Sequence, residues 1–200
     1  MAVDTLAHRL IFIRHGETDW NAEGRLQGQH DIPINGRGRD QAASAGRDAR
    51  KYIAREGLTG LRFLASPLSR TRETMEIARG AMALDPKDYA LDDRLMELSF
   101  GRWEGLIWPE VQAMDPWAAK AREGDKWLFQ PPGGESYAML ADRLRPWLAT
   151  VDCDTLVVSH GGVARVLMAM IGGIPVSQAP MMDIHQGRVL IFEKGTRRWL

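Results

Sequence analysis

The chain has 200 residues, a length that suits one domain with a substantial hydrophobic core. Its 26 Lys and Arg residues balance 26 Asp and Glu residues, so no global field draws the chain to nucleic acid or to an anionic membrane. The single cysteine, Cys153, excludes an internal disulfide and a multi-cysteine metal site.

The sequence shows no targeting segment and no membrane span. The first residues lack a basic flank followed by a long apolar stretch, which a signal peptide requires. Nowhere does the chain contain a run of about 18 apolar residues, the length that crosses a bilayer. We therefore expect a soluble, cytoplasmic protein that binds neither membranes nor nucleic acid.

The first third of the chain alternates strand-like and helix-like segments. Apolar residues at 8–14 predict a strand, and the Gly-, Asn- and Pro-rich stretch 24–35 predicts a loop. Alanines and charges at helical spacing predict a helix over 36–56 that stops at a glycine. A second strand is predicted at 61–65. A second helix is predicted over 66–79, with a serine cap and a proline in its first turn.

The middle of the chain is less regular. A short strand is predicted at 89–91, and a helical pattern covers 106–123, where two prolines interrupt it. The Pro- and Gly-rich stretch 130–134 breaks the chain direction before a helix predicted over 135–150.

The last quarter of the chain predicts a buried strand followed by a helix and closing strands. The apolar run 154–159 is the buried strand, and a helix follows to residue 171. Segments 182–186, 187–193 and 197–200 are expected to be antiparallel strands. The whole pattern predicts α/β layering in a single domain, 1–200, with a mostly parallel sheet and antiparallel C-terminal strands.

Two predicted strands end in a histidine followed by glycine. His15 follows Arg14 at the end of the first strand, and His160 directly follows the apolar run 154–159. Open α/β sheets bind ligands at the carboxyl ends of their strands, so both histidines are candidates for one site. An Arg guanidinium suits phosphate oxygens, and a neutral imidazole can attack phosphorus. The alternative is that both are hydrogen-bonded core histidines.

Other routes to phosphoryl chemistry lack their motifs in this sequence. The five histidines form no His-x-His or His-Glu-x-x-His pair, which argues against a zinc site, and no Walker phosphate loop is present. Cleavage of a phosphomonoester needs cations on the phosphoryl oxygens, a nucleophile and an acid for the leaving group. Covalent catalysis by histidine, with no metal and no cofactor, is the remaining hypothesis.

Five sequence blocks, in order along nearly the whole chain, resemble motifs of the histidine phosphatase superfamily, which has the phosphoglycerate mutase-like fold. The blocks are Arg14-His15-Gly16-Glu17-Thr18-Asp19-Trp20-Asn21, Ser66-Pro67-Leu68-Ser69-Arg70-Thr71-Arg72-Glu73-Thr74, Glu97-Leu98-Ser99-Phe100-Gly101-Arg102-Trp103-Glu104-Gly105, Pro132-Gly133-Gly134-Glu135-Ser136 and Ser159-His160-Gly161-Gly162. The resemblance implies a three-layer αβα sandwich.

The resemblance also implies a role for each catalytic candidate. His15 would be the nucleophile that forms a phosphohistidine. Arg14, Arg70 and His160 would surround the transferred phosphoryl group and stabilise its growing charge. Glu97 would protonate the leaving oxygen and then deprotonate the water that resolves the intermediate.

A second set of residues would bind the substrate. Asn21 would donate a hydrogen bond to phosphate, while Gln27, Gly28 and the backbone of Gly161 would line the pocket. For Gln27 and Gly28 the alternative is that they serve only a turn.

Two catalytic assignments also have alternatives. Arg70 would be structural if it paired with a carboxylate of its own helix, and Glu104 competes with Glu97 for the acid.

The resemblance covers both phosphatases and mutases. Cofactor-dependent phosphoglycerate mutases insert a segment with extra basic residues, whereas only 35 residues separate Glu97 from Gly133 here. That stretch is rich in tryptophan and either contacts the substrate or only packs. We therefore expect hydrolysis of a small phosphomonoester, with mutase activity and a noncatalytic phospholigand-binding module as alternatives. A homodimer is compatible with the resemblance.

Overall fold

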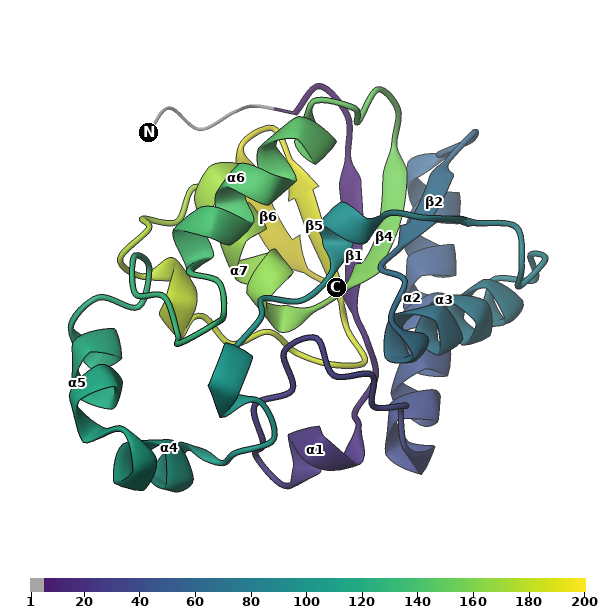
Figure 1. The fold of residues 1–200 in the computed structure, drawn as a ribbon. Helices are drawn as coiled ribbons and strands as arrows, with labels where there is room; N and C mark the ends of the chain where they lie inside the picture. Colours follow the sequence, from purple (N-terminus) through teal and green to yellow (C-terminus); the bar gives the residue numbers. More distant parts are fainter. Residues whose placement is uncertain (1–5) are drawn as a thin grey trace.

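The computed structural model describes residues 6–200, which form a six-stranded mixed sheet covered by helices on both faces (Figure 1). The strand order is β3-β2-β4-β1-β5-β6. The strands are β1 (Leu10–Arg14), β2 (Arg62–Ala65), β3 (Ala90–Leu91), β4 (Thr155–Ser159), β5 (Val189–Glu193) and β6 (Thr196–Trp199). Strands β1 to β4 run parallel to one another, whereas β5 is antiparallel to both of its neighbours, β1 and β6. The predicted mostly parallel sheet with antiparallel C-terminal strands is therefore confirmed.

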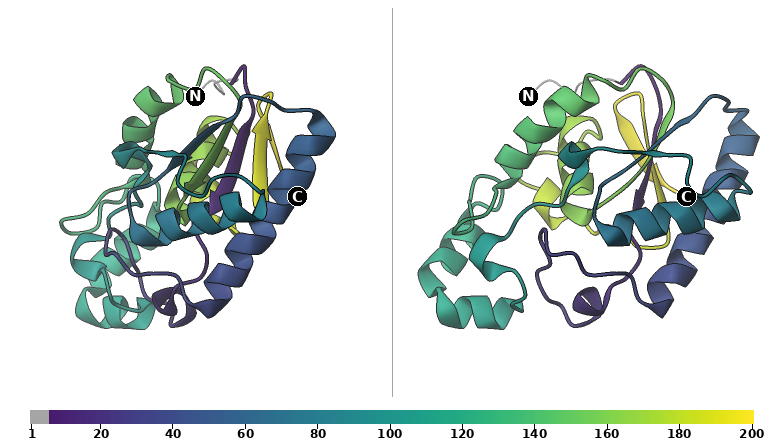
Figure 2. Two further views of the ribbon diagram at one scale, coloured as in Figure 1. Left: turned by 90° about the vertical axis from the view of Figure 1, so that its right-hand side faces the viewer. Right: turned by 45° about the vertical axis from the view of Figure 1, so that its right-hand side comes forward.

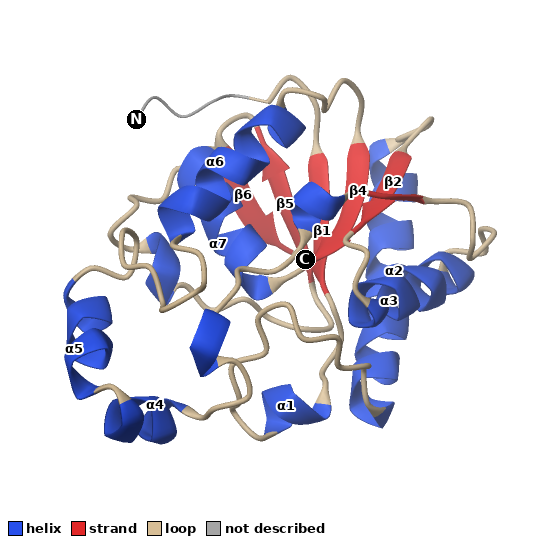
Figure 3. Cartoon of the chain, in the orientation of Figure 1, coloured by secondary structure: helices blue, strands red, loops and turns tan. Residues whose placement is uncertain are grey.

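Two helices cover each face of the sheet, which confirms the three-layer arrangement. Helices α2 (Gly36–Glu56) and α3 (Ser69–Ala81) lie on one side, and α6 (Tyr137–Leu148) and α7 (Gly161–Met170) lie on the other. The views in Figure 2 show the sheet between α6 and α2. Colouring by secondary structure shows the strands enclosed by these helices (Figure 3).

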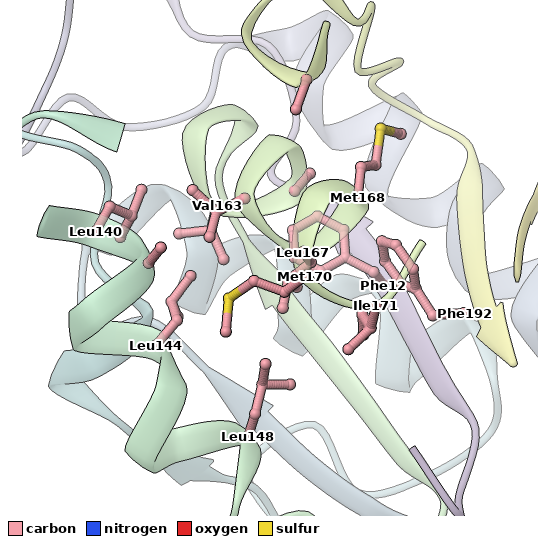
Figure 4. Close-up of a cluster of buried hydrophobic side chains, with 14 of the residues drawn as sticks. Phe12, Leu140, Leu144, Leu148, Val163, Leu167, Met168, Met170, Ile171 and Phe192 are labelled. Atoms are coloured by element: carbon pink, nitrogen blue, oxygen red, sulfur yellow. The ribbon is translucent and has the colours of Figure 1, made fainter. Parts of the chain in front are cut away.

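Strand β1 explains why both faces of the sheet are covered. Its side chains alternate between the faces, and all of its apolar residues are buried. Leu10 and Phe12 join the cluster with α6 and α7, whereas Ile11 and Ile13 join the cluster with α2 and α3. Figure 4 shows Phe12 in the first cluster. An unbroken apolar strand of this kind requires a helical layer on each side.

The carboxyl ends of the parallel strands face a group of short elements. These are α1 (Asp19–Ala22), the 3₁₀ turn η2 (Gly101–Trp103), α4 (Trp108–Met114) and α5 (Pro116–Gly124). Figure 1 shows β1 running down toward α1, with α4 and α5 further out on the same side. A small apolar cluster around Trp103 and Val111 holds this region together.

Several predicted boundaries are confirmed and two helix predictions are wrong in detail. The helix over 36–56 is confirmed in full: Asn35 caps it and Gly57 ends it with φ 63°. The next helix begins at Ser69 rather than at Ser66, so Ser66 is no cap. The segment 106–123 is two helices because Pro116 begins a new one, α5, after Asp115.

The predicted strand at 182–186 is wrong. The segment follows the 3₁₀ turn η3 (Ala179–Met181) and takes no place in the sheet. Its carbonyl groups accept side-chain hydrogen bonds instead: that of Met182 from Arg165 Nε at 2.9 Å, and that of Ile184 from Arg14 Nη1 at 2.8 Å. An alternation of apolar residues does not show whether the backbone pairs with a neighbouring strand or accepts hydrogen bonds from side chains.

None of the helices within residues 6–200 has the length and apolar character needed to cross a membrane.

Candidate active site

The adjacent strands β1 and β4 bring the two predicted histidines together. The strands pair in parallel with Arg14 opposite Ser159, so the segments that follow the two strands leave the sheet at the same point. The N–H of His15 still donates to the carbonyl of Ser159 at 2.9 Å. As a result the rings of His15 and His160 lie edge to face, with centroids 5.2 Å apart. Residues 145 positions apart in sequence thus meet at the carboxyl edge of the sheet.

A pocket of about 140 Å³ opens at this edge. Eight of the nine residues predicted for the site line it, and His160 lies behind them, fully buried. The eight are Arg14, His15, Asn21, Gln27, Gly28, Arg70, Glu97 and Gly161.

The environment of His15 defines its tautomer and its charge. Its Nδ1 lies 2.8 Å from the carbonyl oxygen of Gly16, so Nδ1 carries the proton and Nε2 keeps its lone pair. Only 2% of the residue is exposed. Burial, and then the charges of Arg70 and Arg14, lower the pKa of His15 well below its ordinary value. His15 is therefore a neutral imidazole near pH 7, the form that can attack phosphorus.

A glycine is required at position 16 because the backbone packs closely against α2, not because a ligand must come close to it. A Cβ at this position would overlap the backbone of Gly38 in the first turn of α2. The N–H of Gly16 donates to Thr74 Oγ1 of α3 at 3.0 Å. Helices α2 and α3 thus fix the backbone immediately after the candidate nucleophile.

Arg14 and Arg70 present charge to the pocket without a carboxylate partner. Arg70 is fully buried and donates to the carbonyls of His30 at 2.6 Å and Gly28 at 2.8 Å. In the described chain no carboxylate forms an ion pair with Arg70, so the alternative that it pairs on its own helix is wrong. Burial lowers the pKa of Arg14 to about 10, so this guanidinium stays protonated at neutral pH. A half-buried and a fully buried arginine, neither of which forms an ion pair with a carboxylate among residues 6–200, suit an anionic ligand.

The structure distinguishes Glu97 from Glu104 as the candidate for the catalytic acid. Glu97 lines the pocket, and its Oε1 accepts from the N–H groups of Leu98 at 2.9 Å and Gly162 at 3.0 Å. A Cβ at Gly162 would overlap this carboxylate, which explains the second glycine after His160. Glu104 is not among the pocket residues, and its Oε1 instead accepts from Phe100 N at 2.9 Å and Ser99 Oγ at 3.0 Å. Glu104 therefore organises the loop around the site.

His160 is held by the residue predicted to cap a helix. Its Nε2 lies 2.8 Å from Ser66 Oγ, and its buried Nδ1 has no hydrogen-bond partner. Burial is the main cause that lowers the pKa of His160 well below its ordinary value, followed by the charge of Arg70. Ser66 thus orients His160 behind the pocket.

Arg165 and Tyr137 also line the pocket and were not predicted. Arg165 lies one helical turn after Gly161 on α7, so its position on the same face is the signal that could have identified it. Tyr137 begins α6 directly after its cap, Ser136. Nothing in the sequence around Tyr137 indicates that its ring reaches the pocket.

The tryptophans of segment 103–127 pack around the pocket or face solvent. Trp103 is buried and stacks on Phe129, with ring centroids 5.5 Å apart. Trp127 stacks on Tyr137 with centroids 6.0 Å apart, and Trp117 is 82% exposed. None of these three lines the pocket. Within residues 6–200, no three His, Cys, Asp or Glu side chains gather in a way that could hold a metal ion.

Acid is expected to destabilise the folded chain through its two buried histidines. The unfolded chain takes up protons on His15 and His160 near pH 6.5, whereas the folded chain binds them only at much lower pH. The free energy of unfolding should therefore fall below about pH 6.5, by about 1.4 kcal/mol per pH unit for each histidine. Urea titrations at about pH 7, 6 and 5 measure this slope. His160→Asn should remove about half of it, and an unchanged slope would contradict the buried neutral state.

The comparisons with known proteins agree with this geometry. The family model of the histidine phosphatase superfamily (branch 1) matches residues 10–200. The chain is 34% identical to glucosyl-3-phosphoglycerate phosphatase of Mycolicibacterium vanbaalenii, over 87% of this chain and 78% of that protein. It is 35% identical to the probable phosphoglycerate mutase GpmB of Salmonella paratyphi B, over 96% of this chain and 87% of that protein.

A solved structure shares the fold. The structure of a mycobacterial glucosyl-3-phosphoglycerate phosphatase in complex with VO3 has a TM-score of 0.77 and 29% identity, and it covers 97% of each chain. Five ordered motifs, a pocket built by eight of the nine expected residues and a family match over almost the full length lead to one conclusion. The chain belongs to the histidine phosphatase superfamily, branch 1.

Proposed function

We propose that this chain is a single-domain, cytoplasmic phosphomonoesterase that hydrolyses a small phosphorylated metabolite through a phosphohistidine at His15. The observation that carries the proposal is the neutral His15, with Nε2 unprotonated, in a pocket with two arginines that lack carboxylate partners. The zero net charge of the chain supports a small molecule rather than a nucleic acid as substrate.

In the first step His15 Nε2 attacks phosphorus, and the ester P–O bond breaks as the N–P bond forms. Arg14 and Arg70 stabilise the charge on the phosphoryl oxygens, and each such donor commonly contributes about 3 kcal/mol in the transition state. His160 and Asn21 complete the binding of the group, with Gln27, Gly28 and Gly161 along the wall.

Glu97 handles the proton in both steps. It donates a proton to the leaving oxygen, so the product departs as an alcohol. It then takes a proton from the water that attacks the phosphohistidine, which breaks the N–P bond and releases inorganic phosphate. The two backbone N–H groups that bind its carboxylate keep it in the pocket during both transfers.

Relatives of both kinds exist, so mutase activity is the second candidate. One relative is a phosphatase by name and another is a probable mutase. The short segment between Glu97 and Gly133 supports hydrolysis, since it has little room for an insertion that would exclude water. Release of inorganic phosphate from 3-phosphoglycerate, against its conversion to 2-phosphoglycerate, distinguishes the two activities.

Glu97→Gln tests the proton transfer that the proposal requires. Glutamine keeps the shape of the side chain but cannot donate a proton as an acid. Hydrolysis of an alkyl phosphate in EDTA should slow by a factor of about 10² to 10⁴. Hydrolysis of p-nitrophenyl phosphate should slow much less in its first step, because nitrophenolate leaves without protonation.

Burst kinetics with p-nitrophenyl phosphate separate the two steps. Glu104→Gln is the matched control, because Glu104 holds the loop outside the pocket. Equal losses of the first step on both esters in Glu97→Gln would remove Glu97 from the role of leaving-group acid. Loss of wild-type activity in EDTA would contradict the metal-independent mechanism.

A further inference from the structure

The segment that carries Glu97 belongs to no helix or strand. Residues 96–100 lie between the 3₁₀ turns η1 (Asp93–Leu95) and η2. The backbone groups of such a segment have no regular partners, and a buried backbone group without a partner is unfavourable. The partners that this segment finds elsewhere in the chain therefore determine where the carboxyl group of Glu97 lies.

Arg143 of α6 binds this segment through three carbonyl groups. Its Nη1 donates to the carbonyls of Arg94 at 2.8 Å and Met96 at 2.9 Å, and its Nη2 donates to that of Glu97 at 3.3 Å. The N–H groups of a guanidinium lie in one plane with fixed directions. One side chain thus holds the peptide groups on both sides of the Glu97 Cα atom.

Glu135 orients this guanidinium and binds the same segment. Its two carboxylate oxygens accept from Arg143 Nε at 3.2 Å and from Arg143 Nη2 at 2.9 Å. The backbone of Ser99 is bound as well: its N–H donates to Glu135 Oε2 at 3.1 Å, and its carbonyl accepts from the N–H of Glu135 at 2.8 Å. A carboxylate and a guanidinium joined at two points have a defined mutual geometry. Arg143 and Glu135 therefore act as one unit on residues 94–99.

The glycines of the block Pro132-Gly133-Gly134-Glu135-Ser136 allow this close approach. A Cβ at Gly134 would overlap the carbonyl oxygen of Ser99. Gly101 has φ 56°, and a Cβ there would overlap the carbonyl oxygen of Pro132. No residue of the block lines the phosphoryl pocket. The block instead packs, backbone against backbone, on the segment that follows Glu97.

We propose that Arg143 and Glu135 are positioning residues for Glu97: they fix the backbone that carries the catalytic acid and so keep its carboxyl group aligned with the leaving oxygen. Neither residue lines the pocket, so both act through Glu97 and not on the substrate. The inference rests on the proposed function, in which Glu97 protonates that oxygen. Since proton transfer requires hydrogen-bond distance, loss of either residue should slow most the esters whose leaving group needs the proton.

The test compares phenyl phosphate with p-nitrophenyl phosphate, whose nitro group makes the better leaving group. Single-turnover experiments in EDTA, with enzyme in excess, measure release of the phenol and so report the first step alone. Arg143→Met should slow this step by a factor of about 10 to 100 with phenyl phosphate, and by less than about threefold with p-nitrophenyl phosphate. Glu135→Gln is the milder change, because its amide oxygen can still accept from Ser99, and it should shift the ratio of the two rates in the same direction.

A double substitution shows whether Arg143 acts through Glu97. In Glu97→Gln the acid is already absent, so adding Arg143→Met should slow the first step with phenyl phosphate by no more than about a further twofold. The matched control is Arg9→Met, since Arg9 is also a partly buried arginine, paired with Glu193 at 2.9 Å at the opposite end of β1. It should lower the midpoint of thermal unfolding, as Arg143→Met does, but leave the ratio of the two rates unchanged.

Equal slowing of both esters in Arg143→Met and Glu135→Gln would overturn the inference, and so would losses that multiply in the double variant. If Arg143→Met did not fold, the ratio measured for Glu135→Gln would decide. Failure of the proposed function has a different result, because wild type itself would then hydrolyse neither ester.

Discussion

Replacing His15 with alanine is expected to lower kcat/KM for phosphomonoester hydrolysis by a factor on the order of 10⁴ to 10⁶. Among the pocket residues that the structure describes, His15 is the one whose side chain offers an uncharged nitrogen with a free lone pair, and the substitution removes it. Water would then have to attack phosphorus directly, without the covalent intermediate that divides the reaction into two easier steps. Steady-state assays with p-nitrophenyl phosphate in EDTA measure the loss.

The control for this variant is His8→Ala. His8 lies near Arg9 and Asp154, at the opposite end of β1 from the pocket. Its removal should leave kcat/KM within about twofold of wild type. Thermal unfolding of His15→Ala shows whether the chain still folds. A folded His15→Ala variant that keeps more than about a tenth of the wild-type rate would contradict the role of His15.

Replacing Arg70 with methionine is expected to have the second largest effect. Arg70 is fully buried, its Nε has no hydrogen-bond partner, and no carboxylate among residues 6–200 forms an ion pair with it, so its guanidinium can bind a phosphoryl oxygen. Loss of one such donor should reduce kcat/KM by a factor of about 10² to 10³. The same change leaves the carbonyls of Gly28 and His30 without their donor, so the midpoint of thermal unfolding should also fall.

Two further variants separate charge from structure at this position. Arg70→Lys keeps the charge but loses the fork that binds two carbonyls, so we expect partial recovery of the rate at most. Arg72→Met, on the exposed side of the same helix, should change neither the rate nor the unfolding midpoint appreciably. If Arg70→Met lowered only the unfolding midpoint and left kcat/KM unchanged, Arg70 would be structural.

The parts of the fold that follow from local chemistry were predictable from the sequence. Helix α2 begins after Asn35, whose side chain accepts from the N–H of Gly38 at 2.9 Å, and it ends at Gly57 in the left-handed region. Both signals are local, so the predicted bounds 36–56 match the structure. The prediction of a strand at 182–186 was wrong because carbonyl groups of this segment accept hydrogen bonds from two distant arginines, Arg14 and Arg165. Local periodicity carries no information about such contacts.

The residues of the site likewise include some that were predictable from the sequence and some that were not. Both histidines were predictable because parallel strands place their carboxyl ends at one edge, so position along the strand determined position in space. The contact between Ser66 and His160 was missed because it joins the ends of two strands through a loop. Arg165 could have been identified from its helical spacing after Gly161, whereas the place of Tyr137 depends on how α6 packs on the sheet, which residue order does not specify.

The most direct test of the account is to quench the enzyme during turnover and locate the phosphoryl group by mass spectrometry. We predict one phosphoryl group per chain on His15, in a bond that acid breaks and alkali preserves, as expected of an N–P bond. Rapid quenching in alkali after mixing with p-nitrophenyl phosphate preserves this species. Turnover without any phosphoryl group on His15, or with the group on another residue, would contradict the account.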